Sequence, residues 1–276
     1  MIHENIPVSM PGSLKDAHLT TYFLDYYDEL PKDQKHPTVI ICPGGAYAFL
    51  ADREAEIIAL QFNSMGYNAA VLYYSVAPAV YPAALTEVAA SVKMLKDRAE
   101  EWRIDKDNIF VMGFSAGGHL AASYGVFWNQ SFLAERLQCE SARLAVKGLI
   151  LCYPVITSRK EYTHEDSFKN LMGDAFQEEG KEMSLEYHVG PQVPPAFLWH
   201  AFGDQSVPFQ NSLLFVEAMG KAGVQTEFHL YTGGDHGLSL AKEFLRREIG
   251  TGVYEPAQSW FPLLETWIEN RCKEQQ

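Results

Sequence analysis

Cysteine is scarce in this chain, and its four cysteines form no recognisable pair. Cys42, Cys139, Cys152 and Cys272 show neither a C-x-x-C spacing nor a spacing typical of metal ligands. Cys42 and Cys152 each end an apolar run, which is typical of a buried thiol. This pattern argues against a disulfide framework and against a metal site. It favours a reducing compartment, so we expect a cytoplasmic protein without a metal.

Long hydrophobic runs and basic clusters are absent as well. No apolar run approaches the length that crosses a membrane, and the first residues have neither the basic nor the apolar region of a signal peptide. The chain carries 22 basic and 35 acidic side chains, a net charge of −13. Nucleic acids and anionic membranes attract basic patches, so the charge argues against both as partners.

The composition and patterning predict an α/β fold. Of the 276 residues, 47% are apolar and 21% are charged, which is typical of a globular chain with a large core. Short apolar runs alternate with amphipathic helical patterns, which predicts a mostly parallel central sheet flanked by helices. The expected strands are 19–27, 38–42, 68–74, 109–112, 146–153, 196–202 and 226–231. The expected helices are 52–65, a segment starting after Pro82, 119–127, 209–216 and 260–268.

Residues 157–192 interrupt this rhythm. They are polar, rich in Glu and Lys, and long for a connection between a strand and the next. Insertions of this length are typical of lids and binding elements. We found no internal repeat and no linker, so we expect residues 1–276 to form a single domain with 157–192 as a small cap- or lid-like insertion.

One serine stands in a turn of unusual composition. Residues 113–118, with the sequence GFSAGG, lie between an expected strand and an expected helix. This is the G-x-S-x-G layout of a nucleophile elbow, in which small neighbours permit a sharp turn and expose the serine hydroxyl. Taken alone, the pattern is as typical of an ordinary Gly/Ser turn. Its interpretation therefore depends on partners for Ser115.

A serine nucleophile needs a base to take its proton and an acid to orient that base. In a parallel sheet, functional groups follow the C-terminal ends of strands. Asp204 comes just after the expected strand 196–202, and His236 just after 226–231. The order Ser, Asp, His is that of α/β-hydrolases. We therefore predict a catalytic triad of Ser115 as nucleophile, His236 as base and Asp204 as acid.

Each partner has an alternative reading. Asp204 could be a turn residue after glycine, and His236 a solvated loop histidine. Asp235 is the rival acid, but adjacent side chains rarely point toward each other. We expect His119, one turn into the helix after Ser115, to be packed or hydrogen-bonded, and His200 to lie in the core.

Acyl transfer also needs N–H donors for the oxyanion of its tetrahedral intermediate. The amide of Ala116, directly after the serine, is one candidate. The loop after the strand 38–42, with the sequence PGGAY from residue 43, is the other, although it can also be an ordinary Pro-Gly turn. We expect Tyr47 and Val207 to contact substrate. For Tyr47, core packing is the alternative.

Together these motifs resemble the esterase/lipase branch of the α/β-hydrolases, which includes hormone-sensitive-lipase-like enzymes and bacterial acetyl-xylan and feruloyl esterases. The chain looks most like the small members labelled sugar esterases or sugar hydrolases, and the resemblance covers residues 38–267. It rests on the elbow with the following HLAA at 119–122, on YY at 73–74 with AP at 77–78, on GDQSVP at 203–208 and on GDHG at 234–237.

The resemblance implies an α/β-hydrolase fold and ester hydrolysis through an acyl-enzyme, with no metal and no organic cofactor. The His-Gly-Gly-Gly loop of the family aligns with residues 43–46, which implies Gly45 and Ala46 as oxyanion donors. Proline replaces the histidine and alanine the last glycine. The implied partner is a small-molecule ester, with an acylated saccharide as one candidate, and a homodimer is compatible with this reading.

Other functions share parts of this pattern. Dipeptidyl-type serine peptidases have the same triad order, but this chain lacks their large N-terminal region of repeated short strands. An arylformamidase is a further enzymatic alternative. A non-catalytic, ligand-binding protein of this fold is the alternative outside enzymes, and such proteins usually lack a triad member, whereas none is missing here.

Overall fold

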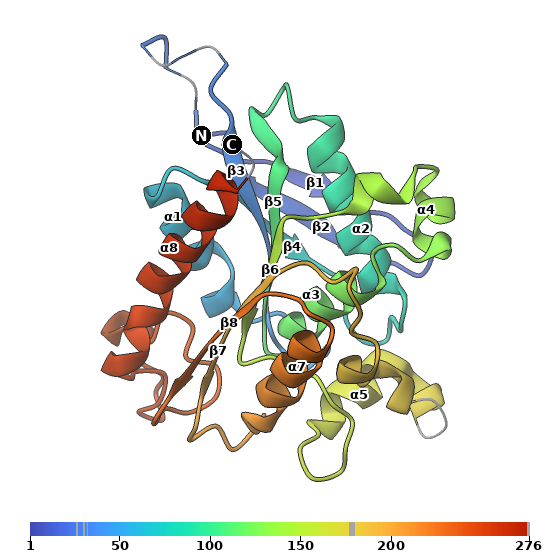
Figure 1. Cartoon of the computed structure of the whole chain (residues 1–276), viewed down its shortest axis with the longest axis vertical. Coiled ribbons are helices and arrows are strands. Elements are labelled where there is room, and N and C mark those ends of the chain that lie inside the picture. The colour runs from blue at the N-terminus through green and yellow to red at the C-terminus, as the bar shows by residue number, and fades with distance from the viewer. Residues whose placement is uncertain (26, 30, 32, 177–179, 275–276) are drawn as a thin grey trace.

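Eight strands form one sheet in the order β1-β2-β4-β3-β5-β6-β7-β8 (Figure 1). The computed structural model describes residues 1–25, 27–29, 31, 33–176 and 180–274. The sheet is parallel from β4 to β8, and β2 and β1 extend it as antiparallel strands at one edge. The strands are β1 (Asn5–Pro7), β2 (His18–Tyr22), β3 (His36–Cys42), β4 (Asn68–Tyr73), β5 (Ile104–Phe114), β6 (Gly148–Cys152), β7 (Ala196–Ala201) and β8 (Thr226–Tyr231).

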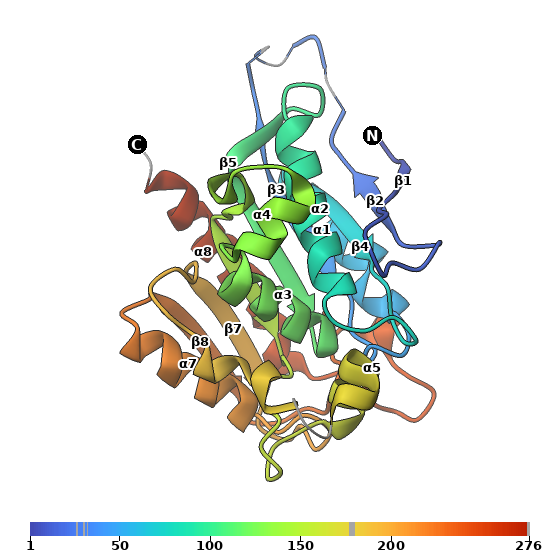
Figure 2. The same ribbon diagram turned by 90° about the vertical axis from the view of Figure 1, so that its right-hand side faces the viewer.

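Helices cover both faces of this sheet, so its central strands are buried on both sides and carry nearly continuous apolar runs (Figures 1 and 2). The helices are α1 (Glu56–Ser64), α2 (Ala83–Asp97), α3 (Ala116–Phe127), α4 (Ser131–Leu137), α5 (Glu165–Met172), α7 (Gln210–Lys221) and α8 (Trp260–Lys273). Short 3₁₀ turns are η1 (Asp52–Glu54), η2 (Ser141–Leu144), η3 (Gly173–Ala175), η4 (Gly180–Met183), η5 (Leu185–Tyr187), η6 (Glu243–Leu245) and η7 (Glu255–Ser259).

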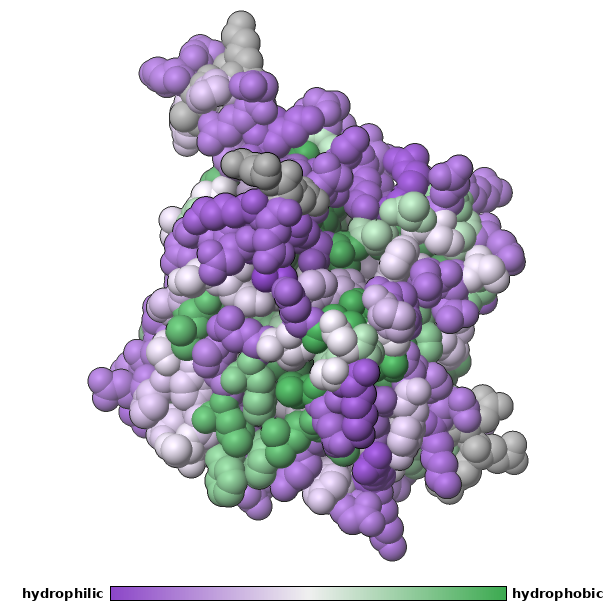
Figure 3. All heavy atoms as spheres, in the orientation of Figure 1, coloured by the Kyte–Doolittle hydropathy of each residue, from purple (hydrophilic) through white to green (hydrophobic). Residues whose placement is uncertain are grey.

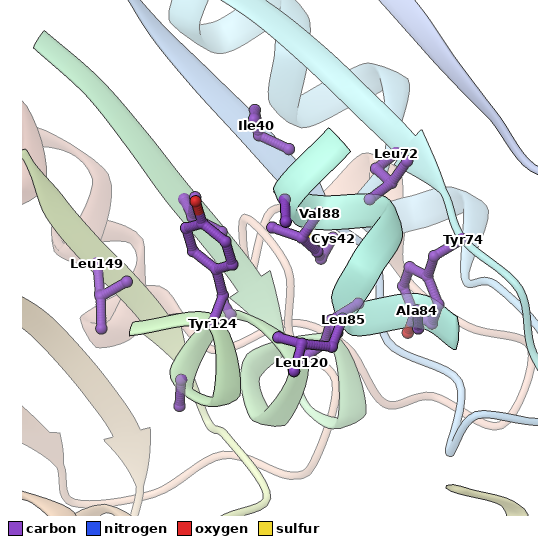
Figure 4. Close-up of a cluster of buried hydrophobic side chains, with 14 of the residues drawn as sticks. Ile40, Cys42, Leu72, Tyr74, Ala84, Leu85, Val88, Leu120, Tyr124 and Leu149 are labelled. Carbon is purple, nitrogen blue, oxygen red and sulfur yellow. The ribbon is translucent and has the colours of Figure 1, made fainter. Parts of the chain in front are cut away.

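Successive strand residues point to opposite faces and so divide the core into two clusters. Ile40 and Val111 pack with α2 and α3 on one face, whereas Ile41 and Met112 pack with α1 and α8 on the other. Figure 4 shows the first cluster, in which side chains of β3 and β4 meet those of α2 and α3. The sequence patterns at these strands therefore predict the layered fold correctly.

The structure corrects several expected boundaries. β2 ends at Tyr22, short of the expected 19–27, because the chain leaves the ladder there: the Leu24 N–H donates to the side chain of Asn68 instead. Residue 26 lies outside the described part. The helix expected over 52–65 is interrupted at Ala55, where the backbone leaves helical angles between η1 and α1. The sequence patterns also did not predict α4.

The 157–192 segment contains α5, η3, η4 and η5, with residues 177–179 outside the described part. Figures 1 and 2 place α5 at the end of the molecule where the parallel strands terminate. Figure 3 shows a mostly hydrophilic face, in keeping with the net charge, with apolar side chains gathered in its lower half over β7 and β8. Among the described residues, no helix is long and apolar enough to cross a membrane.

Candidate active site

Strand β5 ends in a sharp turn that presents Ser115 at the C-terminal edge of the sheet. Its backbone has φ 53° and ψ −117°, a region that costs a non-glycine residue about 1–3 kcal/mol. Neighbouring glycines make the turn sterically feasible. A Cβ on Gly113 would overlap the Gly117 carbonyl oxygen, and one on Gly117 would overlap the Cys42 carbonyl oxygen. The G-x-S-x-G spacing therefore reflects close packing of β3, β5 and α3.

The three predicted triad residues lie in one chain of hydrogen bonds. Ser115 Oγ is 2.8 Å from Nε2 of His236, and Nδ1 of the same ring is 2.6 Å from Asp204 Oδ2. Ser115 is 8% exposed, the His236 side chain is 20% exposed, and the Asp204 side chain is fully buried. The ring of Tyr153 packs edge-on against His236 at 5.2 Å. The structure thus brings together residues more than 120 positions apart.

The carboxylate of Asp204 is held on both oxygens. Its Oδ1 accepts the N–H groups of Ser206 (3.0 Å) and Val207 (2.9 Å). His200 Nε2 lies 3.4 Å from Oδ2 and 2.9 Å from the Val207 carbonyl oxygen. Burial alone would raise the pKa of Asp204, but the interactions with His200 and His236 outweigh it and hold the pKa below its ordinary value. His200 lies in the core, as predicted, and also supports the acid.

Asp235, the rival acid, faces away from the imidazole that it adjoins in sequence. Its carboxylate pairs with Arg247 and accepts the Gly252 N–H at 3.3 Å. Arg247 also donates to the carbonyl oxygen of His236 at 2.9 Å. Asp235 therefore fixes the loop that carries the histidine, while Asp204 contacts the ring.

Residues 43–47, which we call the oxyanion loop after their predicted role, pack directly against the elbow. A Cβ on Gly44 would lie 3.0 Å from the Cβ of Ser115. The carbonyl groups of residues 44–47 all accept hydrogen bonds from elsewhere: from the Ala51 N–H, the Ala48 and Phe49 N–H groups, the Asn170 side chain and the Ala77 N–H, respectively. Within the described part of the chain, the amides of Gly45, Ala46 and Ala116 donate to no acceptor. N–H groups without partners can bind an anion where they point to one place, and the role of these three amides as oxyanion donors stays a prediction.

A buried glutamate supports this loop from behind. Glu54 is 1% exposed; its Oε2 accepts the Gly44 N–H at 2.9 Å and its Oε1 the Tyr153 hydroxyl at 2.8 Å. Tyr153 in turn accepts the Ser239 N–H and packs on His236. The sequence analysis missed both residues. The position of Tyr153 directly after β6 was an available signal, whereas Glu54 had none.

Tyr47 and Val207, the predicted substrate contacts, are both buried. Tyr47 is 2% exposed, and its hydroxyl lies 2.9 Å from Nδ1 of His119. Val207 is 0% exposed, and its amide holds Asp204. The packing alternative considered for Tyr47 therefore describes its side chain, and contact of either residue with substrate stays a prediction.

The 157–192 segment carries a further histidine, His164, that did not stand out in the sequence. Burial lowers the pKa of His164, and the charge of His236 lowers it further. His164 Nδ1 is 2.9 Å from Ser167 Oγ, at the start of α5. Within the described ranges, no group of three or more His, Cys, Asp or Glu side chains is placed to hold a metal ion.

His119 is packed and hydrogen-bonded, as expected. It is 1% exposed, its Nε2 is 3.0 Å from the Met183 carbonyl oxygen, and Phe168 packs edge-on against its ring. Burial lowers the pKa of His119 to about 4. The neutral ring then donates from Nε2 to Met183 and accepts the Tyr47 hydroxyl at Nδ1.

This burial predicts a pH dependence of stability. The unfolded chain binds a proton at His119 below about pH 6.5, whereas the folded chain binds it only below about pH 4. Neutral His119 therefore contributes fully to the free energy of unfolding above about pH 6.5. This contribution falls by up to about 3 kcal/mol as the pH is lowered to about 4. Urea unfolding at several pH values measures the free energy of unfolding, which should depend less steeply on pH in this window for His119→Gln than for the wild type. Equal slopes would contradict the assignment.

Comparisons with known proteins show which family the chain belongs to. The chain matches the BD-FAE family over residues 24–219. Endo-1,4-beta-xylanase B of Butyrivibrio fibrisolvens is 32% identical over 234 residues, which make up 82% of this chain and 36% of that protein. The acetylxylan esterase of Xylanibacter ruminicola is 26% identical over 221 residues, 78% of this chain and 44% of that protein. The chain thus spans less than half the length of these curated relatives.

Solved structures match over nearly the whole chain. An acetyl ester-xyloside bifunctional hydrolase from Caldicellulosiruptor lactoaceticus is 35% identical, with a TM-score of 0.76 over 96% of this chain and 92% of that one. A carboxylesterase from Lactobacillus plantarum is 28% identical, with a TM-score of 0.83 over 98% of both chains. The family match spans more than half of the sequence and the fold agrees throughout. The chain therefore belongs to the BD-FAE family and has the α/β-hydrolase fold.

Proposed function

We propose that this protein is a serine carboxylesterase that removes small acyl groups from esters through an acyl-enzyme. One observation carries the proposal: the hydrogen-bonded series Ser115, His236 and Asp204 lies beside a loop with unpaired amides. A nucleophile with its base, an acid that orients the base, and donors for an oxyanion are the groups that acyl transfer requires.

The proposed reaction has two stages. Ser115 Oγ attacks the ester carbonyl while its proton moves to Nε2 of His236, and the oxyanion is bound by the amides of Gly45, Ala46 and Ala116. The tetrahedral intermediate collapses as His236 returns the proton to the leaving alcohol, which forms the acyl-serine. Water then attacks with His236 again as base, and the acid is released. Throughout, Asp204 orients the imidazole and stabilises its protonated form.

We propose acetylated saccharides as the substrate class. Support comes from the relatives, one of which is named an acetylxylan esterase and another an acetyl ester-xyloside hydrolase. Ser115 is only 8% exposed, which favours a small acyl group at the nucleophile. We also propose that residues 1–276 form one catalytic domain, with 157–192 as its cap.

A substrate panel tests this proposal. We expect turnover of p-nitrophenyl acetate and release of acetate from acetylated xylo-oligosaccharide, with little turnover of an aminoacyl-proline anilide or of N-formylkynurenine. Preferred cleavage of the anilide would indicate the peptidase alternative, and preferred cleavage of N-formylkynurenine the arylformamidase. Binding of the oligosaccharide without turnover of any ester would identify a ligand-binding protein and refute the esterase proposal.

A further inference from the structure

A side chain of the 157–192 segment reaches into the oxyanion loop. Asn170, on the last turns of α5, donates from Nδ2 to the carbonyl oxygen of Ala46 at 2.9 Å and is half-buried. The same segment makes a second polar contact with this region, because the Met183 carbonyl accepts from His119, whose other ring nitrogen meets the Tyr47 hydroxyl. Two consecutive residues of the loop are thus tied to one inserted segment.

The loop needs such contacts because its turn is unfavourable for the residues in it. Ala46 has φ 56° and Tyr47 has φ 55°, and the Ala48 N–H donates to the Gly45 carbonyl at 2.9 Å. These features fit a type I′ turn, which favours Gly or Asn at both central positions. Side chains with a Cβ adopt this backbone under strain, and the strain persists only where surrounding contacts fix the turn.

The hydrogen bond of Asn170 holds the peptide group between Ala46 and Tyr47. In a trans peptide the C=O and the following N–H point in opposite directions, so a donor that holds the Ala46 carbonyl also sets the direction of the Tyr47 N–H. The two backbone angles at Ala46 link this peptide to the one that carries the Ala46 N–H, a proposed oxyanion donor. Rotation of the peptide would therefore displace that donor.

We propose that Asn170 is a positioning residue for the oxyanion loop, so that the 157–192 segment takes part in transition-state stabilisation as well as covering the site. The inference rests on the proposed esterase function. Asn170 does not touch the reacting atoms. It acts through the Ala46 carbonyl, and its contribution belongs to the step in which charge develops on the substrate oxygen.

Asn170→Asp tests this inference, because the carboxylate has the same shape but cannot donate and repels the Ala46 carbonyl. We expect kcat for p-nitrophenyl acetate to fall about 10- to 100-fold with little change in KM, the result of a misplaced oxyanion donor. A trifluoromethyl ketone, which adds to the serine and leaves an oxyanion, should bind more weakly by the same factor as kcat/KM falls. Asn170→Ala leaves the Ala46 carbonyl unpaired but does not repel it. Its kcat and its affinity for the inhibitor should therefore lie between those of the wild type and those of Asn170→Asp.

A matched control separates positioning from general destabilisation. Asn63, near the end of α1, also donates from Nδ2 to backbone carbonyl oxygens, those of Tyr22 and Tyr67, away from the site. Asn63→Asp should lower the Tm but leave kcat and inhibitor binding unchanged. Wild-type kcat and inhibitor affinity in folded Asn170→Asp would overturn the inference; if that variant does not fold, the same readouts on Asn170→Ala decide. Wild-type protein without esterase activity would instead refute the proposed function.

Discussion

Ser115→Ala is expected to lower kcat for p-nitrophenyl acetate on the order of a million-fold, while the fold is retained. The reason is that the variant lacks the hydroxyl proposed to form the acyl-enzyme, although the proposed oxyanion donors and His236 stay in place. Alanine fits the turn because the serine side chain has one hydrogen bond, to His236, and Cβ remains in the same backbone conformation. Labelling by a fluorophosphonate should be lost together with hydrolysis, and circular dichroism and the Tm should change little.

Ser123→Ala is a suitable control for this experiment. Ser123 is buried on α3, the helix that follows Ser115, and its hydroxyl lies 3.4 Å from Nδ1 of His119. It should keep both hydrolysis and labelling. If Ser115→Ala retained even a tenth of the wild-type kcat, or were still labelled, the nucleophile would have to be another residue.

Asp204→Asn should lower kcat about 10⁴-fold, the second largest effect that we expect. The Asn carbonyl can still accept the N–H groups of Ser206 and Val207, so the loop geometry is kept. The new NH₂ group would then face Nδ1 of His236, where the carboxylate accepts the hydrogen bond of the Nδ1–H group in the wild type. The ring would be driven to the tautomer with its proton on Nε2, which cannot accept the proton of Ser115.

Asp235→Asn distinguishes the two candidate acids. This carboxylate pairs with Arg247 and not with the imidazole, so its loss should loosen the loop and lower kcat by about tenfold or less. Steady-state kinetics of the two variants side by side provide the measurement. A larger loss for Asp235→Asn than for Asp204→Asn would reverse the assignment.

The sequence predicts those features of the protein that depend on local pattern. Short apolar runs place β3, β4, β6, β7 and β8 within two residues of their bounds, because buried parallel strands have little tolerance for polar side chains. β5 begins at Ile104, five residues before the expected strand 109–112, because the three residues after Ile104 are polar and partly exposed. The elbow is visible because close packing requires Gly113 and Gly117. Ser115, Asp204 and His236 each follow a strand, and their common location follows from the geometry of a parallel sheet, in which the strands end at a common edge.

The parts that the sequence did not predict depend on contacts between distant segments. In the sequence, Glu54 looks like a solvent-exposed charged residue at the start of a helix. In the structure it is buried and accepts the Gly44 N–H. Asn170 lies 124 positions from the carbonyl that it binds, and no periodicity marks it. The burial of Val207 is similarly a tertiary effect, since its short segment after β7 gave no sign of which side chains would face the site.

The central claim is that acyl transfer proceeds through Ser115, and trapping the intermediate tests it most directly. Acetylated xylo-oligosaccharide is mixed with the enzyme, the reaction is stopped with acid within the first turnovers, and peptides are analysed by mass spectrometry. We predict a peptide with residues 113–118 that carries one acetyl group, located on Ser115 by fragmentation and absent from Asp204→Asn under the same conditions. An acetyl group on another residue, or steady release of acetate with an acetyl-serine that never forms, would contradict the account.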